Sequence, residues 1–216
     1  MLFRSPDAIL IDIGTTTTDI VPIRDGRVVA RGLTDLDRLM ADELLYTGAV
    51  RTPVETITTV VPVPGGTCSL AAEAFALSGD VHLWRGHLRP QDYTSPTPDG
   101  RPPTRKSAGI RLARVVCGDR DLIDTRAVTR IADAIAEAQI RRITRAIRRV
   151  RGRGRRRLTR AIVVGVGEFL GESAARRAGL RVVKVSHERG RAASRAAAAV
   201  AVAGLLSGSI THGANE

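Results

Sequence analysis

The last third of the chain alternates apolar strands with helices, and this alternation constrains the fold more than any other feature. The run AIVVGV at 161–166 is typical of a buried strand, and a helix is expected from there to about Ala178. Arg181–Val185 predicts a second strand, and residues 192–206 predict an apolar helix. Strands that alternate with helices form parallel sheets covered by helices, so we expect an α/β fold.

The helix expected before this alternation is long, and the segments at the start of the chain are short. Apolar residues recur every three or four positions over 125–150, which predicts one amphipathic helix. Three short runs, 8–13, 19–24 and 27–31, predict a β-meander with a tight turn at Asp25-Gly26. A capping-box pattern at Thr34 starts a helix expected to reach about Leu45, and residues 67–78 predict an Ala-rich helix.

The expected organisation is one domain over 1–216. It comprises the meander and helices of 8–88, a Pro-rich surface loop over 89–107, the helices and parallel strands of 108–206, and a tail over 207–216.

Composition indicates a reduced cytoplasmic protein without a membrane segment. No run of about 18 apolar residues exists, and the first residues lack the apolar stretch and cleavage site of a signal peptide. Cys68 and Cys117 lie far apart and form no CxxC pair. His82 and His87 share no metal-ligand spacing with them, which argues against zinc.

A net charge of +12 raises the question of nucleic-acid binding. The positive charge is almost entirely arginine, and 141–160 holds 11 arginines in 20 residues without interleaved aromatic side chains. We therefore favour a solvated helix end and loop and expect no nucleic-acid partner. A polyanion-binding protein without catalytic activity is the alternative.

The stretch Asp12-Ile13-Gly14-Thr15-Thr16-Thr17-Thr18-Asp19 carries the strongest chemical signal. A carboxylate ends a buried strand, a glycine allows close approach of the backbone, and four hydroxyls follow. Turn amides and Thr hydroxyls donate to phosphate oxygens, and Asp12 can hold Mg²⁺ directly or through water. A Thr-rich β-turn without a ligand is the alternative, because Thr favours strands.

The motif DIGTTTTDIVPIRDG resembles the second phosphate motif of the hydantoinase A/oxoprolinase family, which has the actin-like ATPase (ribonuclease H-like, acetate-sugar kinase/Hsc70/actin) superfold. The segments GLTDLDRLMADELLYTGAVRTP, EAFALSGDVHLWRG, TPDGRPPT and RLARVVCGD are similar to one branch, the synthases of methanofuran biosynthesis and their relatives in tetrahydromethanopterin-linked one-carbon metabolism. The resemblance runs from about Ala8 to Leu206.

This resemblance implies a transferase. In that branch an aminomethylfuran diphosphate is coupled to the phenol oxygen of a γ-glutamyl-tyramine unit, and pyrophosphate leaves. The small-molecule diphosphate would occupy the turn with Mg²⁺. We take Asp12, Asp19 and Arg51 as the catalytic candidates. Arg51 is either a bidentate clamp for an anionic group or an arginine in a solvated strand. The alternative within the family is an ATP-dependent hydantoinase or 5-oxoprolinase subunit, with ATP in the turn.

Family members also carry an earlier Asp-x-Gly-Gly turn on a first lobe. We expect that lobe to be missing here and the chain alone to be inactive. A homo-oligomer is compatible with the sequence.

Further residues are candidates for the walls of the cleft, each with a structural alternative. Gly165 and Gly167 follow a strand and open a helix, where they form either a ligand-lining turn or a purely structural one. Tyr46 is either a substrate contact or a half-buried anchor. Arg111 and Arg114 are three residues apart and could face the cleft together, with solvent exposure as the alternative. Glu73 is either a surface residue or a metal or substrate ligand, and Asp99 is either a turn residue or part of the site.

Overall fold

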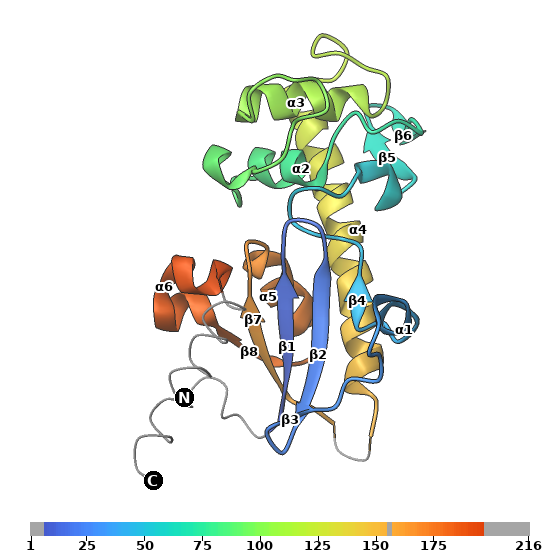
Figure 1. The fold of residues 1–216 in the computed structure, drawn as a ribbon. Helices are drawn as coiled ribbons and strands as arrows, with labels where there is room; N and C mark the ends of the chain where they lie inside the picture. Colours follow the sequence, from blue (N-terminus) through green and yellow to red (C-terminus); the bar gives the residue numbers. More distant parts are fainter. Residues whose placement is uncertain (1–6, 155–156, 197–216) are drawn as a thin grey trace.

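The computed structural model describes residues 7–154 and 157–196, which form an α/β fold around one mixed sheet (Figure 1). The strand order is β3-β2-β1-β7-β8, and β4 also pairs with β2. β2 runs antiparallel to β1, β3 and β4, whereas β7 runs parallel to β1 and β8. The strands are β1 (Ala8–Ile13), β2 (Thr18–Arg24), β3 (Arg27–Val28), β4 (Leu44–Leu45), β7 (Arg160–Val164) and β8 (Arg181–Lys184).

The N-terminal meander confirms the prediction from the apolar runs. Asp25 and Gly26 both have positive φ, 48° and 73°, as a two-residue hairpin turn requires, and they join β2 to β3. The side chains of Ile9, Ile11 and Ile13 are fully buried on one face of β1. Because β1 lies in the middle of the sheet, the turn that follows it is held on a rigid strand.

The predicted parallel part is also present. Helix α5 (Glu168–Arg177) connects β7 to β8, and α6 (Val185–Arg195) follows β8 directly. Gly190, at φ 84° and ψ 161°, interrupts α6. The helix predicted over 192–206 overlaps α6 only in its first residues, and its part beyond residue 196 lies outside the described residues.

Helix α4 (Thr125–Arg151) confirms the long amphipathic helix and connects the two halves of the molecule. Its 27 residues span about 40 Å at 1.5 Å per residue. The Asp124 side chain accepts from the Ala127 amide and caps the helix start. Ile131 and Ile135 enter one hydrophobic core, and Ile143, Ile147 and neighbouring residues enter another core beneath the sheet. Across the described ranges, no helix has both the length and the apolar character needed to cross a bilayer.

A smaller layer lies beyond the ends of β1 and β2, around the first half of α4 (Figure 1). It contains the hairpin β5 (Val60–Val63) and β6 (Gly66–Ser69), helix α2 (Ser78–Trp84) and helix α3 (Arg105–Arg114). The helix predicted over 67–78 is therefore wrong. Pro64 and Gly65 (φ 86°) form the two-residue turn of a β-hairpin, so residues 66–69 pair with β5 instead of coiling.

Helix α1 (Asp35–Met40) is shorter than predicted. Thr34 and Asp37 form the expected capping box. Asp42 then adopts a positive φ of 52°, and the chain turns into β4 beside β2. The segment expected to end the helix therefore extends the sheet next to the Thr-rich turn.

Candidate functional site

The turn between β1 and β2 has an unusual balance of hydrogen-bond donors and acceptors. It is closed by the Gly14 amide, which donates to the Thr17 carbonyl at 3.0 Å. Within the described part of the chain, the amides of Thr15, Thr16 and Thr17 donate to no acceptor. The hydroxyls of Thr15 and Thr16 lie 3.4 Å apart on the same turn. Free amides beside hydroxyls are donors that an anion can accept, so the turn carries the donor set on which the prediction of phosphate binding rests.

The segment that follows β4 holds the carbonyls of this turn. The Ala49 amide donates to the Gly14 carbonyl at 2.9 Å, and the amides of Val50 and Arg51 donate to the Thr15 carbonyl at 3.0 and 2.8 Å. The carbonyl oxygens of Gly14 and Thr15 thus have donors from the protein. The amides of Thr15–Thr17 have no acceptor among the described residues, so they can donate to a ligand. The YTGAVRTP block thus clamps the turn of residues 14–17 through its backbone. We call this turn the phosphate turn after its predicted ligand.

Thr18 has a role other than the predicted one, and Gly14 is not needed for packing within the protein. Thr18 is fully buried, and its hydroxyl donates to the Thr47 carbonyl at 2.6 Å, so it ties the turn to the core instead of offering its hydroxyl to a phosphate. At Gly14 an added Cβ would meet only the Thr17 carbonyl oxygen, at an ordinary 3.8 Å. Protein packing therefore does not require glycine at position 14, which is compatible with the predicted close approach of a ligand to the backbone.

Asp12 and Asp19 are paired across β1 and β2, directly below the turn. Burial, and secondarily the charge of Asp19, raises the pKa of Asp12 to about 6. Asp19 itself forms an ion pair with Arg38 of α1 at 2.5 Å. Asp19 therefore has a cationic partner, whereas Asp12 is a partly desolvated carboxylate near the end of β1, just before the turn begins.

The Gly165–Gly167 turn lies against the same strand end. Gly165 has φ 95°, and a Cβ there would come within 2.5 Å of the Asp12 carboxylate. The Gly167 amide donates to the Ile13 carbonyl at 2.9 Å, and a Cβ on Gly167 would approach the Ile13 side chain. Both glycines are required by close packing, and the structure brings this turn to the Asp12 side of the phosphate turn.

A buried polar network that sequence reasoning missed supports the clamp from below. A Cβ on Gly48 would lie 2.5 Å from the backbone of Thr15, so the two backbones are in direct contact. The Gly48 carbonyl accepts from Gln139 Nε2 at 2.8 Å and from the Ser78 hydroxyl at 2.9 Å. Gln139, fully buried on α4, also accepts from His82 at 2.9 Å. In the sequence, the sign of this network is Gln139, an uncharged polar residue at a core position of α4.

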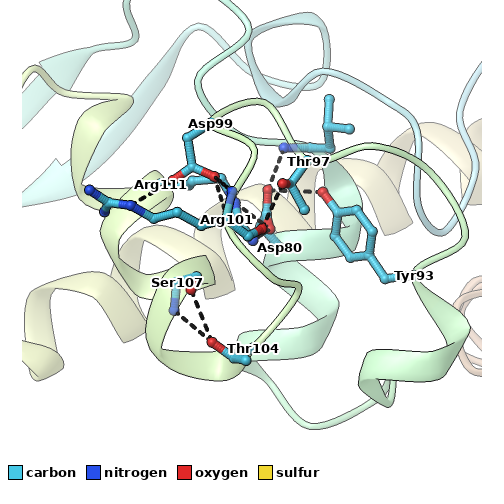
Figure 2. Close-up of polar contacts among 9 residues, drawn as sticks. Asp80, Tyr93, Thr97, Asp99, Arg101, Thr104, Ser107 and Arg111 are labelled. Carbon is cyan, nitrogen blue, oxygen red and sulfur yellow. Dashed lines mark hydrogen bonds and ion pairs between the residues drawn. The ribbon is translucent and has the colours of Figure 1, made fainter.

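Figure 2 shows a second network, in which Arg111 lies between two carboxylates. Arg111 Nε and Nη2 donate to Asp80 Oδ1 at 2.9 and 2.7 Å, and Nη1 donates to Asp99 Oδ1 at 2.8 Å. The Tyr93 hydroxyl donates to Asp80 Oδ2 at 3.3 Å. Burial alone would lower the pKa of Arg111, but Asp80 and Asp99 raise it, so the guanidinium stays charged.

This network corrects the prediction for α3. Arg111 is 1% exposed, whereas Arg114 is exposed on another face of the helix, so the two do not face a cleft together. Asp99 ties the 89–107 loop to α2 and α3 through Arg111, and its own loop turns at Gly100 (φ 71°). Asp99 is therefore a turn residue, as one alternative predicted, and its side chain also holds Arg111 of α3.

The remaining candidates are exposed. Tyr46 is 56% exposed, so the half-buried anchor is ruled out. Glu73 is exposed in an irregular segment, and its carboxylate bonds to no other described residue. The Arg51 side chain is exposed and forms no ion pair within the described ranges. Of these three residues, Arg51 is tied to the phosphate turn through its backbone amide.

Part of the Arg-rich stretch anchors the end of α4. Arg153 pairs with the buried Glu43 at 2.7 Å, and Arg149 pairs with Asp42 at 3.0 Å. Arg151 donates to the Leu158 carbonyl at 2.8 Å, and Arg148 donates to the Arg177 carbonyl at 2.7 Å. Several of these arginines therefore have structural partners, in agreement with a helix end and loop.

The fold and the turn together define a class of protein. Residues 1–207 match the hydantoinase/oxoprolinase family, and the chain belongs to that family.

Within curated proteins, the chain is similar to the (4-{4-[2-(gamma-L-glutamylamino)ethyl]phenoxymethyl}furan-2-yl)methanamine synthase of Methanocaldococcus jannaschii. The identity is 33% over 204 residues, which cover 94% of this chain and 60% of the relative. The protein of the same name from Methanococcus vannielii is 40% identical over 117 residues, 54% of this chain and 52% of the relative. The chain therefore spans less than two thirds of the length of these relatives.

Proposed function

We propose that this chain carries the diphosphate-binding half of a synthase of methanofuran-type cofactor biosynthesis. The reaction would join an aminomethylfuran diphosphate to the phenol oxygen of a γ-glutamyl-tyramine unit. The printed names of both relatives describe a product with a furan-methanamine and a phenoxymethyl group, which supports this choice. The single observation that carries it is the set of amides at Thr15–Thr17 that donate to no described residue, in the turn that follows Asp12 and Ile13.

We also propose that the sheet is the second lobe of an actin-like superfold. An antiparallel meander followed by parallel strands, with the phosphate turn between the first two strands, supports this assignment. In such an arrangement the turn forms one wall of a cleft, and a first lobe supplies the other. The activity of the whole protein would then require both walls, because reacting groups must be held in attack geometry.

The residues present fit a magnesium ion that is shared with the substrate. Within the described ranges no cluster of three His, Cys, Asp or Glu side chains could enclose a metal. Mg²⁺ commonly uses one or two carboxylates, substrate phosphates and waters, and Asp12 provides such a carboxylate. The high pKa of Asp12 shows that its charge is poorly compensated, so a cation beside it would be favourable. The ion would neutralise charge on the departing diphosphate.

The protein's own groups act on the leaving group. The bond between the furfuryl carbon and the diphosphate oxygen breaks, and pyrophosphate keeps the electron pair. The carbon bonds to the phenol oxygen, and the phenol proton passes to water. The amides and hydroxyls of Thr15–Thr17 would donate to the oxygens on which negative charge builds. Arg51 belongs to the segment that clamps this turn, and its side chain is exposed. Its guanidinium would add a bidentate donor to the diphosphate.

A thermal-shift comparison tests the choice of ligand. With Mg²⁺ present, pyrophosphate should raise the melting temperature of the chain more than ATP does at equal concentration. A ligand at a hundred times its Kd stabilises the native state by about 2.7 kcal/mol. Greater protection by ATP would favour the nucleotide-dependent hydantoinase or oxoprolinase alternative, and no protection by either would contradict a phosphate site.

A further inference from the structure

A hollow of about 370 Å³ opens beside the Gly165–Gly167 turn. It is bounded by the start of α5, the end of β8, parts of α6 and the Gly86–His87 segment that follows α2. Its volume lies near the lower end of the range for small-molecule sites. The residues that matter for its chemistry are Gly165, Glu168, Phe169, Glu172 and His87.

The hollow meets the strand end below the phosphate turn at Gly165. This glycine lines the hollow, and a Cβ added to it would lie 2.5 Å from Asp12 Oδ1. A ligand with its diphosphate on Thr15–Thr17 would therefore have its organic part on this side of Asp12. Glycine is required at position 165, because a Cβ would collide with the Ile13 carbonyl and the Asp12 carboxylate and because its φ of 95° disfavours other residues.

An aromatic surface forms one side of the hollow. The Phe169 ring stacks on His87, with ring centroids 4.8 Å apart and planes inclined by 13°. The edge of His82 meets Phe169 at 4.9 Å. Burial lowers the pKa of His87, so its ring is neutral at pH 7 and does not repel a cation. Such a surface suits a flat ring that carries positive charge nearby.

Two carboxylates line the same hollow, and they differ in their partners. Glu172 pairs with Lys184 at 2.8 Å and with Arg176 at 3.0 Å. Glu168 accepts only neutral donors, the Ser186 amide at 3.1 Å and the Ser194 hydroxyl at 3.0 Å among them. No cation pairs with Glu168 within the described ranges. Its position and its uncompensated charge make it a partner for an ammonium group.

The basic side chains at the hollow do not oppose this assignment. Lys184 is neutralised by Glu172, and Arg195 pairs with Asp92 at 2.6 Å. Arg191 and His187 are exposed, so they lie at the solvent side of the hollow.

We infer that this hollow binds the aminomethylfuran half of the diphosphate donor. The furan ring lies against Phe169, the ammonium group pairs with Glu168, and the diphosphate reaches past Gly165 to the phosphate turn. The inference rests on the proposed function, since it takes the donor from there. It assigns a location and named residues to a part of the substrate that the phosphate turn itself does not recognise.

Calorimetric titrations of the chain with four probes test this assignment. The probes are magnesium pyrophosphate, aminomethylfuran diphosphate, furfuryl diphosphate without the amine, and the aminomethylfuran alcohol without phosphate. Phe169→Leu keeps an apolar side chain and should weaken the three furan probes about tenfold, because one ring contact of about 1.4 kcal/mol is lost. Pyrophosphate affinity should stay within about twofold.

Glu168→Gln is the matched variant, since it keeps the shape of the side chain and removes only its charge. It should weaken the two amine-bearing probes and leave furfuryl diphosphate unchanged. Both variants should melt within a few degrees of the parent chain, which excludes misfolding as the cause.

The outcomes separate the inference from the proposed function. If the parent chain binds the aminomethylfuran alcohol through Phe169 and Glu168 but not pyrophosphate, the hollow is supported and the phosphate turn is not. If it binds pyrophosphate and both variants bind every furan probe as the parent does, the inference is overturned. Tighter binding of ADP than of the donor, weakened by Phe169→Leu, would also overturn it and assign the hollow to a nucleoside.

Discussion

Replacing Arg111 by alanine should destabilise the chain more than almost any other single change. Arg111 is 1% exposed, and it supplies three of the donors to Asp80 and Asp99. Without it, Asp80 keeps only the Leu77 amide and the Tyr93 hydroxyl. Removing one partner of a buried ion pair costs about 3–5 kcal/mol of unfolding free energy. Burial already raises the pKa of Asp80, and with Arg111 gone the carboxyl should take up a proton.

Urea unfolding at pH 7, followed by circular dichroism, measures this loss. Arg114→Ala is the matched control, because Arg114 lies three residues along the same helix and is exposed, and it should change stability by less than about 0.5 kcal/mol. The pair Arg111→Met with Asp80→Asn should lose less than Arg111→Ala alone, since the remaining carboxylate, Asp99, is partly exposed and no fully buried charge is left unpaired. An Arg111→Ala variant within about 1 kcal/mol of the control would refute the reasoning.

Two further variants probe the support of the phosphate turn. Burial lowers the pKa of His82 to about 3, so between about pH 6.5 and pH 3 only the unfolded chain binds a proton at this histidine. The free energy of unfolding therefore decreases as the pH falls through this range, by at most about 1.4 kcal/mol per pH unit. His82→Gln should flatten that fall in urea titrations, and an unchanged slope would exclude His82 as its source. Gly48→Ala should abolish magnesium–pyrophosphate binding because its Cβ would meet the Thr15 backbone at 2.5 Å. Gly66→Ala, where nothing lies within 4 Å, should bind as the parent does, and equal binding by both variants would argue against the clamp.

Elements with a strong local pattern were predictable from the sequence. The apolar period of α4 and the runs of β1 and β7 determine those elements, because each buries one continuous set of side chains. The region 67–78 was not predictable from Ala content, because the Pro64-Gly65 turn and pairing with β5 outweigh helix propensity.

The candidate site could be proposed from the sequence where its residues are adjacent. The Thr-rich turn carries its own chemistry, and the family resemblance placed the Gly165 turn near it. The partners of Arg111 were not predictable, because Asp80 and Asp99 lie 31 and 12 residues away and only the tertiary fold selects them. The same applies to Gln139, which contacts Gly48 across 91 residues.

Calorimetry of Asp12→Asn with magnesium and pyrophosphate tests the central claim most directly. The raised pKa of Asp12 means that the charged carboxylate is disfavoured in the folded chain, so this contribution to stability is lost as pH rises through about 6. At pH 8 without ligand, the variant should therefore be more stable than the parent by about 1 kcal/mol, discounted for partial exposure. The account predicts this gain together with complete loss of magnesium-dependent pyrophosphate binding. Binding by the stable variant with the parent's affinity would contradict it.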